Sequence, residues 1–80
     1  MYQYKITVNG AQGPVLNEYP ALGWQAIADA LEARGGHAVL YRRLVADSVD
    51  VADVTLVYGS HIKAGGKLVF RWTVFAELDL

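Results

Sequence analysis

The chain has 80 residues, which is enough for one domain with a small core (residues 1–80), and it contains no cysteine. The lack of cysteine excludes disulfides, thiolate zinc sites and cysteine nucleophiles, and it favours an intracellular setting. Seven Lys and Arg against eight Asp and Glu argue against a general nucleic-acid binder, which is usually basic. A hydrophobic content of 54% is high for so small a domain and predicts association through exposed apolar surface. The N-terminus lacks the pattern of a signal peptide, and no apolar stretch approaches the ~20 residues that span a bilayer.

The chain starts with a predicted hairpin. From Tyr2 to Val8, apolar and polar residues alternate, which is the period of a half-buried strand. Asn9-Gly10 follows directly, and this pair favours a tight turn because both residues tolerate a positive φ. We expect a short second strand over Val15 to Tyr19 that pairs back on the first strand as a sheet edge.

The next segment predicts one amphipathic helix from Pro20 to Arg34. Proline suits the first helical position because its φ is already helical and its missing N–H is not needed there. Apolar side chains recur with a helical spacing and form one stripe: Trp24, Ile27, Ala28 and Leu31. Gly35-Gly36 is expected to end the helix, since glycine can adopt the left-handed cap conformation.

Three further strands are expected, over His37 to Ala46, Val54 to Ile62 and Lys67 to Glu77, with a glycine-containing turn at 63–66. The predicted class is α+β: an antiparallel sheet of four to five strands, in the order ββαβββ, with the helix on one face. Alternation along the last strand assigns four residues to its inward face: Leu68, Phe70, Trp72 and Val74. The aromatic core between helix and sheet is expected to contain Tyr4, Trp24, Phe70 and Trp72.

One helix cannot cover five strands, so part of the sheet is expected to meet water or a partner. The residues expected on this open face are Val39, Tyr41, Val57, Val69 and Phe75. A homodimer through this open face is one way to bury its apolar side chains.

Three aspartates spaced three residues apart, Asp47, Asp50 and Asp53, raise the question of a site. An EF-hand calcium loop needs carboxylates at alternate positions, a central glycine and a closing glutamate, and this segment lacks them. The first interpretation is a solvated loop between strands. The second is an acidic patch that meets a basic groove on another macromolecule.

No residue pattern for catalysis, a metal or a cofactor is present. His37 and His61 lie at ends of predicted strands without an HxH, HExxH or cysteine partner, and two imidazoles alone do not make a zinc site. The glycines at positions 10, 13, 65 and 66 lie in predicted turns and match neither a phosphate loop nor a dinucleotide fingerprint. The sequence therefore predicts a binding protein rather than an enzyme.

Cations near sheet aromatics suggest an alternative function, a small nucleic-acid-binding module, because some folds stack single-stranded bases on such surfaces. The candidate residues are Arg42, Arg43, Lys63, Lys67 and Arg71. Arg42 and Arg43 are adjacent on one strand, so they should point to opposite faces and cannot form one cluster. A self-associating subunit is a further alternative.

The whole chain, MYQYKITVNG…RWTVFAELDL, resembles the small phage-encoded anti-CRISPR proteins in its size, cysteine-free composition and compact α/β plan. The resemblance implies a non-catalytic inhibitor that docks on Cas subunits of a type I CRISPR surveillance complex, in the bacterial cytoplasm, and blocks target DNA binding. Five acidic residues would meet basic Cas surfaces: Asp29, Glu32, Asp47, Asp50 and Asp53. Tyr41 and Phe75 would supply aromatic anchors.

Overall fold

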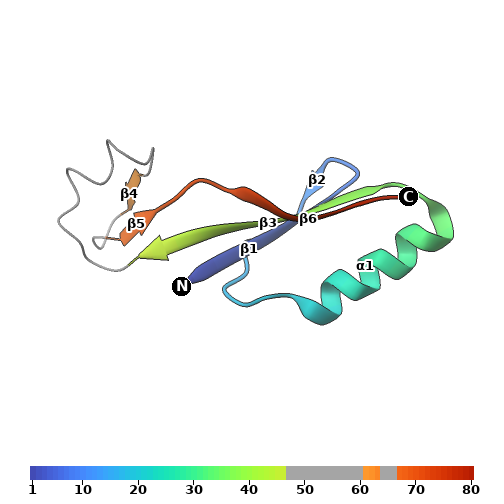
Figure 1. Ribbon diagram of the computed structural model, residues 1–80, viewed down its shortest axis with the longest axis horizontal. Helices are drawn as coiled ribbons and strands as arrows, with labels where there is room; N and C mark the ends of the chain where they lie inside the picture. The colour runs from blue at the N-terminus through green and yellow to red at the C-terminus, as the bar shows by residue number, and fades with distance from the viewer. Residues whose placement is uncertain (47–60, 64–66) are drawn as a thin grey trace.

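The computed structural model describes residues 1–46, 61–63 and 67–80 (Figure 1). In chain order the elements are β1 (Tyr2–Val8), β2 (Ala11–Gln12), α1 (Ala21–Arg34), β3 (His37–Ala46), β4 (His61–Lys63), β5 (Lys67–Val69) and β6 (Thr73–Asp79). The predicted α+β class, with one helix and an antiparallel sheet, is confirmed. Most of the expected strand over 54–62 lies outside the described residues.

Strand β3 organises the sheet because it pairs along both of its edges. On one edge it pairs with β1, where Tyr2 faces Leu44 and Val8 faces Ala38. On the other edge it pairs first with β6 and then, near its end, with β5. The buried apolar core comes mainly from this strand and its neighbours: Leu31, Ala38, Val39, Leu40, Val45, Leu68 and Val69.

The predicted hairpin turn is confirmed, but its second strand lies elsewhere. Asn9 and Gly10 adopt φ values of 48° and 86°. The second strand is β2, directly after the turn, and not the expected segment from Val15 to Tyr19. Pro14 explains the difference, because it has no N–H to donate and so interrupts the pairing. The chain returns to β1 only at Leu16, which exchanges two backbone hydrogen bonds with Tyr4 (N···O 2.7 and 2.8 Å).

The helix agrees with its predicted stripe. It begins at Ala21, one residue later than expected, with Pro20 in the N-cap position. Leu31 is buried, and the other three members of the stripe are half-buried. At the C-terminal end, the Gly35 N–H donates to the Leu31 carbonyl (N···O 2.6 Å). In Figure 1, α1 lies along one face of the sheet.

The expected last strand, from Lys67 to Glu77, is two strands, β5 and β6, separated by residues 70–72. Val69 faces Val45, and Thr73 faces Arg42. The chain therefore advances four residues from Val69 to Thr73, whereas β3 advances three over the same distance. A second register shift follows in β6, opposite the step from Leu40 to Tyr41. Each one-residue shift turns the following side chains to the other face.

These shifts make the predicted inward set wrong. Leu68 is buried as expected, but Val74 is 57% exposed. Val69, which was expected on the open face, is buried. Val39 lies on the same face as Tyr41, as expected, but its side chain is buried there. Simple alternation fails here because it assumes an unbroken strand.

Gly36 is expected to tolerate substitution poorly. Its φ is 130°, and a Cβ there would lie 2.7 Å from Asn9 Oδ1 and 2.9 Å from Leu31 Cδ2. Asn9 cannot move away without losing the hydrogen bond that the His37 N–H donates to its Oδ1 (2.8 Å). Gly36→Ala should lower the free energy of unfolding by about 1–3 kcal/mol in urea denaturation. The control is Gly10→Ala, which shares the backbone strain of a positive φ (86°) but where a Cβ meets nothing within 4 Å; an equal loss in both variants would contradict the steric argument.

Candidate functional site

Two cations and two aromatic side chains gather on one face of the sheet. Lys5 Nζ lies 4.7 Å from the ring centre of Trp72 and 5.3 Å from that of Tyr41. Arg43 Cζ lies 4.3 Å from the Trp72 ring centre. These four residues, Lys5, Tyr41, Arg43 and Trp72, are called the Trp72 cluster. All four are half-buried, so a ligand can still reach them.

The register between β1 and β3 brings three members of the cluster together. Lys5 faces Tyr41 across the two strands, and two residues along, Gln3 faces Arg43. Residues that face each other, and those two apart on a strand, share a face of the sheet. The fourth member, Trp72, comes from the segment between β5 and β6, just before the start of β6.

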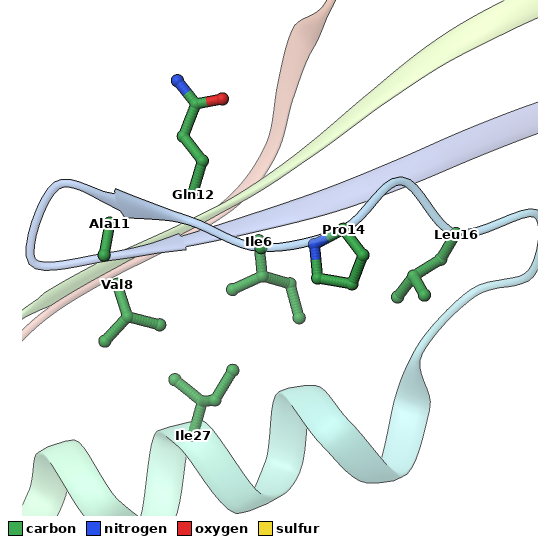
Figure 2. Close-up of a pocket in the computed structure, with 8 residues that line it drawn as sticks. Ile6, Val8, Ala11, Gln12, Pro14, Leu16 and Ile27 are labelled. Atoms are coloured by element: carbon green, nitrogen blue, oxygen red, sulfur yellow. The ribbon is translucent and has the colours of Figure 1, made fainter.

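The Trp72 cluster lies on the face that α1 does not cover. Ile6 follows Lys5 on β1 and therefore points to the opposite face. There it lines a pocket together with Ile27 of α1 (Figure 2). The helix thus occupies the other side of the sheet and leaves the cluster accessible.

The cluster has no compensating carboxylate among the described residues. The Arg43 Nε–H donates to Gln3 Oε1 (2.9 Å), and Gln3 is neutral. The salt bridge found in the described part of the chain is between His37 and Glu77 (Nε2···Oε1 2.7 Å), at the opposite end of β3 from Arg43. Although the whole chain has a formal net charge of −1, this face carries two neighbouring positive charges.

No protein-family model matches the chain, and neither a curated protein nor a solved structure matches it. The chemistry of the site must therefore be inferred from its own residues. Within residues 1–46, 61–63 and 67–80, no three His, Cys, Asp or Glu side chains are placed to hold a metal ion. No helix in this described part has both the length and the apolarity needed to cross a membrane.

A second group of aromatic side chains lies on the opposite face. The rings of Tyr4, Tyr19 and Phe75 pack edge to face, with centroids 5.6–6.1 Å apart. Arg42 Cζ lies 4.6 Å from the ring centres of both Tyr2 and Phe75. Tyr2, Tyr19 and Phe75 are 41–47% exposed, and Arg42 is the one cation in the cation–ring contacts of this group, against two in the Trp72 cluster.

The observed positions of these side chains test several predictions made from the sequence. Arg42 and Arg43 do point to opposite faces, as predicted. The prediction of one shared aromatic core is wrong, because two of its expected members, Tyr4 and Trp72, lie on opposite faces of the sheet. Of the other cations in the nucleic-acid set, Arg71 is exposed. The side chains of Lys63 and Lys67 are outside the described part of the structure.

Of the residues predicted to bind a protein partner, the four that the structure describes are divided between the two faces of the sheet. Asp29 and Glu32 are exposed on α1. Tyr41 belongs to the Trp72 cluster, whereas Phe75 lies on the opposite face. The other predicted partner-binding residues, Asp47, Asp50 and Asp53, lie outside the described residues, as does Val57 of the expected open face. Inhibition of a CRISPR surveillance complex stays a prediction.

Sequence reasoning missed Lys5 as a site residue and assigned Trp72 to the core. Lys5 could be found only by pairing the first strand with His37 to Ala46, because that register places Lys5 opposite Tyr41. No comparable local signal exists for Trp72, whose face depends on the register shift before β6.

The pocket in Figure 2 is a poor candidate for chemistry. It has a volume of about 250 Å³ and lies between the hairpin and α1, with Ile6, Val8, Leu16 and Ile27 in its lining. Gln12, the polar side chain of its lining, points away from the helix in Figure 2. The pocket is therefore an apolar space between helix and sheet, without polar side chains arranged for chemistry.

Proposed function

We propose that the chain is a non-catalytic binding module that holds single-stranded nucleic acid on the Trp72 cluster. The observation that carries this proposal is the meeting of two cations and two aromatic rings on one accessible face, with no carboxylate paired to either cation among residues 1–46, 61–63 and 67–80. Lysine and arginine attract phosphates, while bases stack on aromatic rings and on guanidinium planes. Single strands fit this chemistry because their bases are free to stack on a protein surface.

The aromatic rings favour a nucleic acid over an acidic peptide. A peptide carboxylate would use Lys5 and Arg43 but would leave Trp72 and Tyr41 without a matching group. The cluster is small and the chain as a whole is not basic, so we expect contact with few nucleotides and weak binding. Such binding should depend strongly on salt, because it rests on local charge.

The salt dependence of oligothymidylate binding tests the proposal. In fluorescence anisotropy, a labelled single strand should bind saturably at low salt. If Lys5 and Arg43 each contact one phosphate, the plot of log affinity against log salt should have a slope of about −1.4. Lys5→Gln and Arg43→Gln should each make this slope shallower by about 0.7. Arg34→Gln, which removes an exposed charge on α1, is the matched control and should leave the slope unchanged.

The competing outcomes are distinguishable. A failure of oligothymidylate to bind even at low salt would overturn the proposal. Binding of polyglutamate with no binding of oligothymidylate would also overturn it, and would assign the cluster to an acidic protein partner. If the salt-dependence slope is the same in Lys5→Gln, Arg43→Gln and Arg34→Gln, the oligonucleotide binds elsewhere than at the Trp72 cluster.

A further inference from the structure

Two side-chain amides lie next to the Trp72 cluster on the same face of the sheet. The Arg43 Nε–H donates to Gln3 Oε1 (2.9 Å), and the Gln3 Nε2–H donates to Asn17 Oδ1 (3.1 Å). Strand pairing brings the three residues into one row. Gln3 faces Arg43 across β1 and β3, and the antiparallel bridge at Leu16, the residue before Asn17, sets Asn17 beside Gln3. Gln3 and Asn17 are called the amide pair.

The amide pair and the indole together hold the Arg43 guanidinium. Its Cζ lies 4.3 Å from the ring centre of Trp72, and its Nε–H is bound to Gln3. Because Asn17 accepts from the Gln3 NH₂ group, the Gln3 oxygen is the atom that faces Arg43. Within residues 1–46, 61–63 and 67–80 the guanidinium makes no other hydrogen bond, so Nη1 and Nη2 are not used there. The held guanidinium thus offers a planar fork of N–H donors.

We propose that Arg43 recognises guanine in a bound single strand and that Gln3 is the positioning residue for this contact, an inference that rests on the proposed function. Guanine has two neighbouring acceptors, O6 and N7, and no donor on that edge, so it matches a guanidinium fork with two hydrogen bonds. Adenine has an amino donor in place of O6, which would meet the guanidinium donor to donor. In thymine and cytosine, no edge offers two neighbouring acceptors without a donor.

The two cations of the Trp72 cluster then have different roles. Lysine is a compact charge on a flexible stem, so Lys5 suits a phosphate in many positions. Arginine has a rigid, planar set of donors, so Arg43 can select a partner whose acceptors lie in the same plane. A strand without guanine leaves Arg43 to a phosphate, which is the contact expected with oligothymidylate.

Short oligothymidylates that differ in one central base test the inference by fluorescence anisotropy. Guanine at this position should bind at least about fivefold more tightly than adenine, the lower end of the discrimination by one bidentate pair. Adenine is the control for stacking, because every base can stack on an aromatic ring. 7-Deazaguanine, in which a C–H replaces N7, should lose most of the gain. With guanine the salt-dependence slope should also be shallower by about 0.7 than with thymine alone, because Arg43 then holds a base instead of a phosphate.

The ratio of guanine to adenine affinity, measured on each variant, separates positioning from a general loss of binding. Arg43→Lys keeps the charge but removes the fork, so the ratio should fall to about one. Gln3→Ala leaves the Nε–H without its acceptor and should lower the ratio as well. Gln25→Ala is the matched control, because it removes an exposed amide on α1 that is also bound to a side chain, Asp29 Oδ1 (2.9 Å). It should keep the ratio.

The outcomes separate this inference from the proposed function. If the oligonucleotides bind with equal affinity whichever base they carry, the inference is wrong while the proposed function stands. If none of them binds at low salt, both are wrong. A guanine preference that persists with 7-deazaguanine or in Arg43→Lys would overturn the inference, because another group then recognises the base. A ratio that stays high in Gln3→Ala would overturn the positioning role of Gln3.

Discussion

Trp72→Ala is expected to weaken the binding of a single-stranded oligonucleotide by about 5- to 150-fold. The basis is the contribution of one base stacked on an aromatic ring, about 1–3 kcal/mol by alanine substitution. Trp72 also positions both cations of the cluster, because Lys5 Nζ and Arg43 Cζ lie 4.7 and 4.3 Å from its ring centre. Removing the indole therefore removes a stacking surface and the group that orders the two phosphate contacts.

Fluorescence anisotropy with labelled oligothymidylate measures this loss. Trp72→Phe keeps a ring and should retain most of the affinity. Trp24→Ala, on the opposite side of the molecule on α1, should leave the affinity unchanged. Since the chain has two tryptophans, Trp24→Phe leaves Trp72 as the single reporter, and its fluorescence should change when the oligonucleotide binds. An unchanged affinity in a folded Trp72→Ala protein would mean that the cluster only packs the sheet.

Apart from the place of the second strand, the part of the fold from β1 to β3 could be predicted because its signals are local. Asn9-Gly10 makes the first turn and Gly35 ends the helix, and all three residues are visible in the sequence. The bounds of β3, His37–Ala46, agree with the prediction at both ends. Each of these elements is defined by its own periodicity and by the residues directly next to it.

The part after β3 could not be predicted to the same depth, because its geometry is set by pairing. Nothing in the sequence KLVFRWTVFAE marks a break, yet residues 70–72 separate two strands, with the Phe70 N–H still donating to the Leu44 carbonyl of β3 (N···O 3.0 Å). The break follows from how β5 and β6 share the edge of β3, which is a property of the whole sheet. Each of the two register shifts then reverses the face of the side chains that follow it.

The candidate site combines both kinds of information, which explains why it was only partly foreseen. The opposite faces of Arg42 and Arg43 follow from strand geometry alone. The neighbourhood of Lys5 and Tyr41 follows once β1 is paired with β3 in the observed register. The place of Trp72 needs the shift before β6, and a large aromatic residue in an apolar strand is otherwise most simply assigned to a core. Sequence patterns therefore indicate that cations and aromatic residues form the site, but they do not predict which of them share one face of the sheet.

Leu40→Ala is expected to cause the largest loss of stability, about 2–5 kcal/mol in the free energy of unfolding. Leu40 is fully buried at the centre of β3, with Ile6 of β1 facing it on one side and Ala76 of β6 on the other. Both neighbouring strands are held by backbone pairing, so they cannot easily close on the space that the leucine leaves. For a domain of 80 residues, whose total stability is roughly 4–12 kcal/mol, this loss leaves little margin.

Urea denaturation followed by circular dichroism measures the loss caused by Leu40→Ala. Leu22→Ala is the matched control, because it makes the same chemical change at a side chain that is 88% exposed. Its effect should stay within about 0.5 kcal/mol, as expected for surface substitutions. The contrast between the two leucines measures how far the stability depends on β3. Similar losses at both positions would contradict the place of Leu40 at the centre of the core.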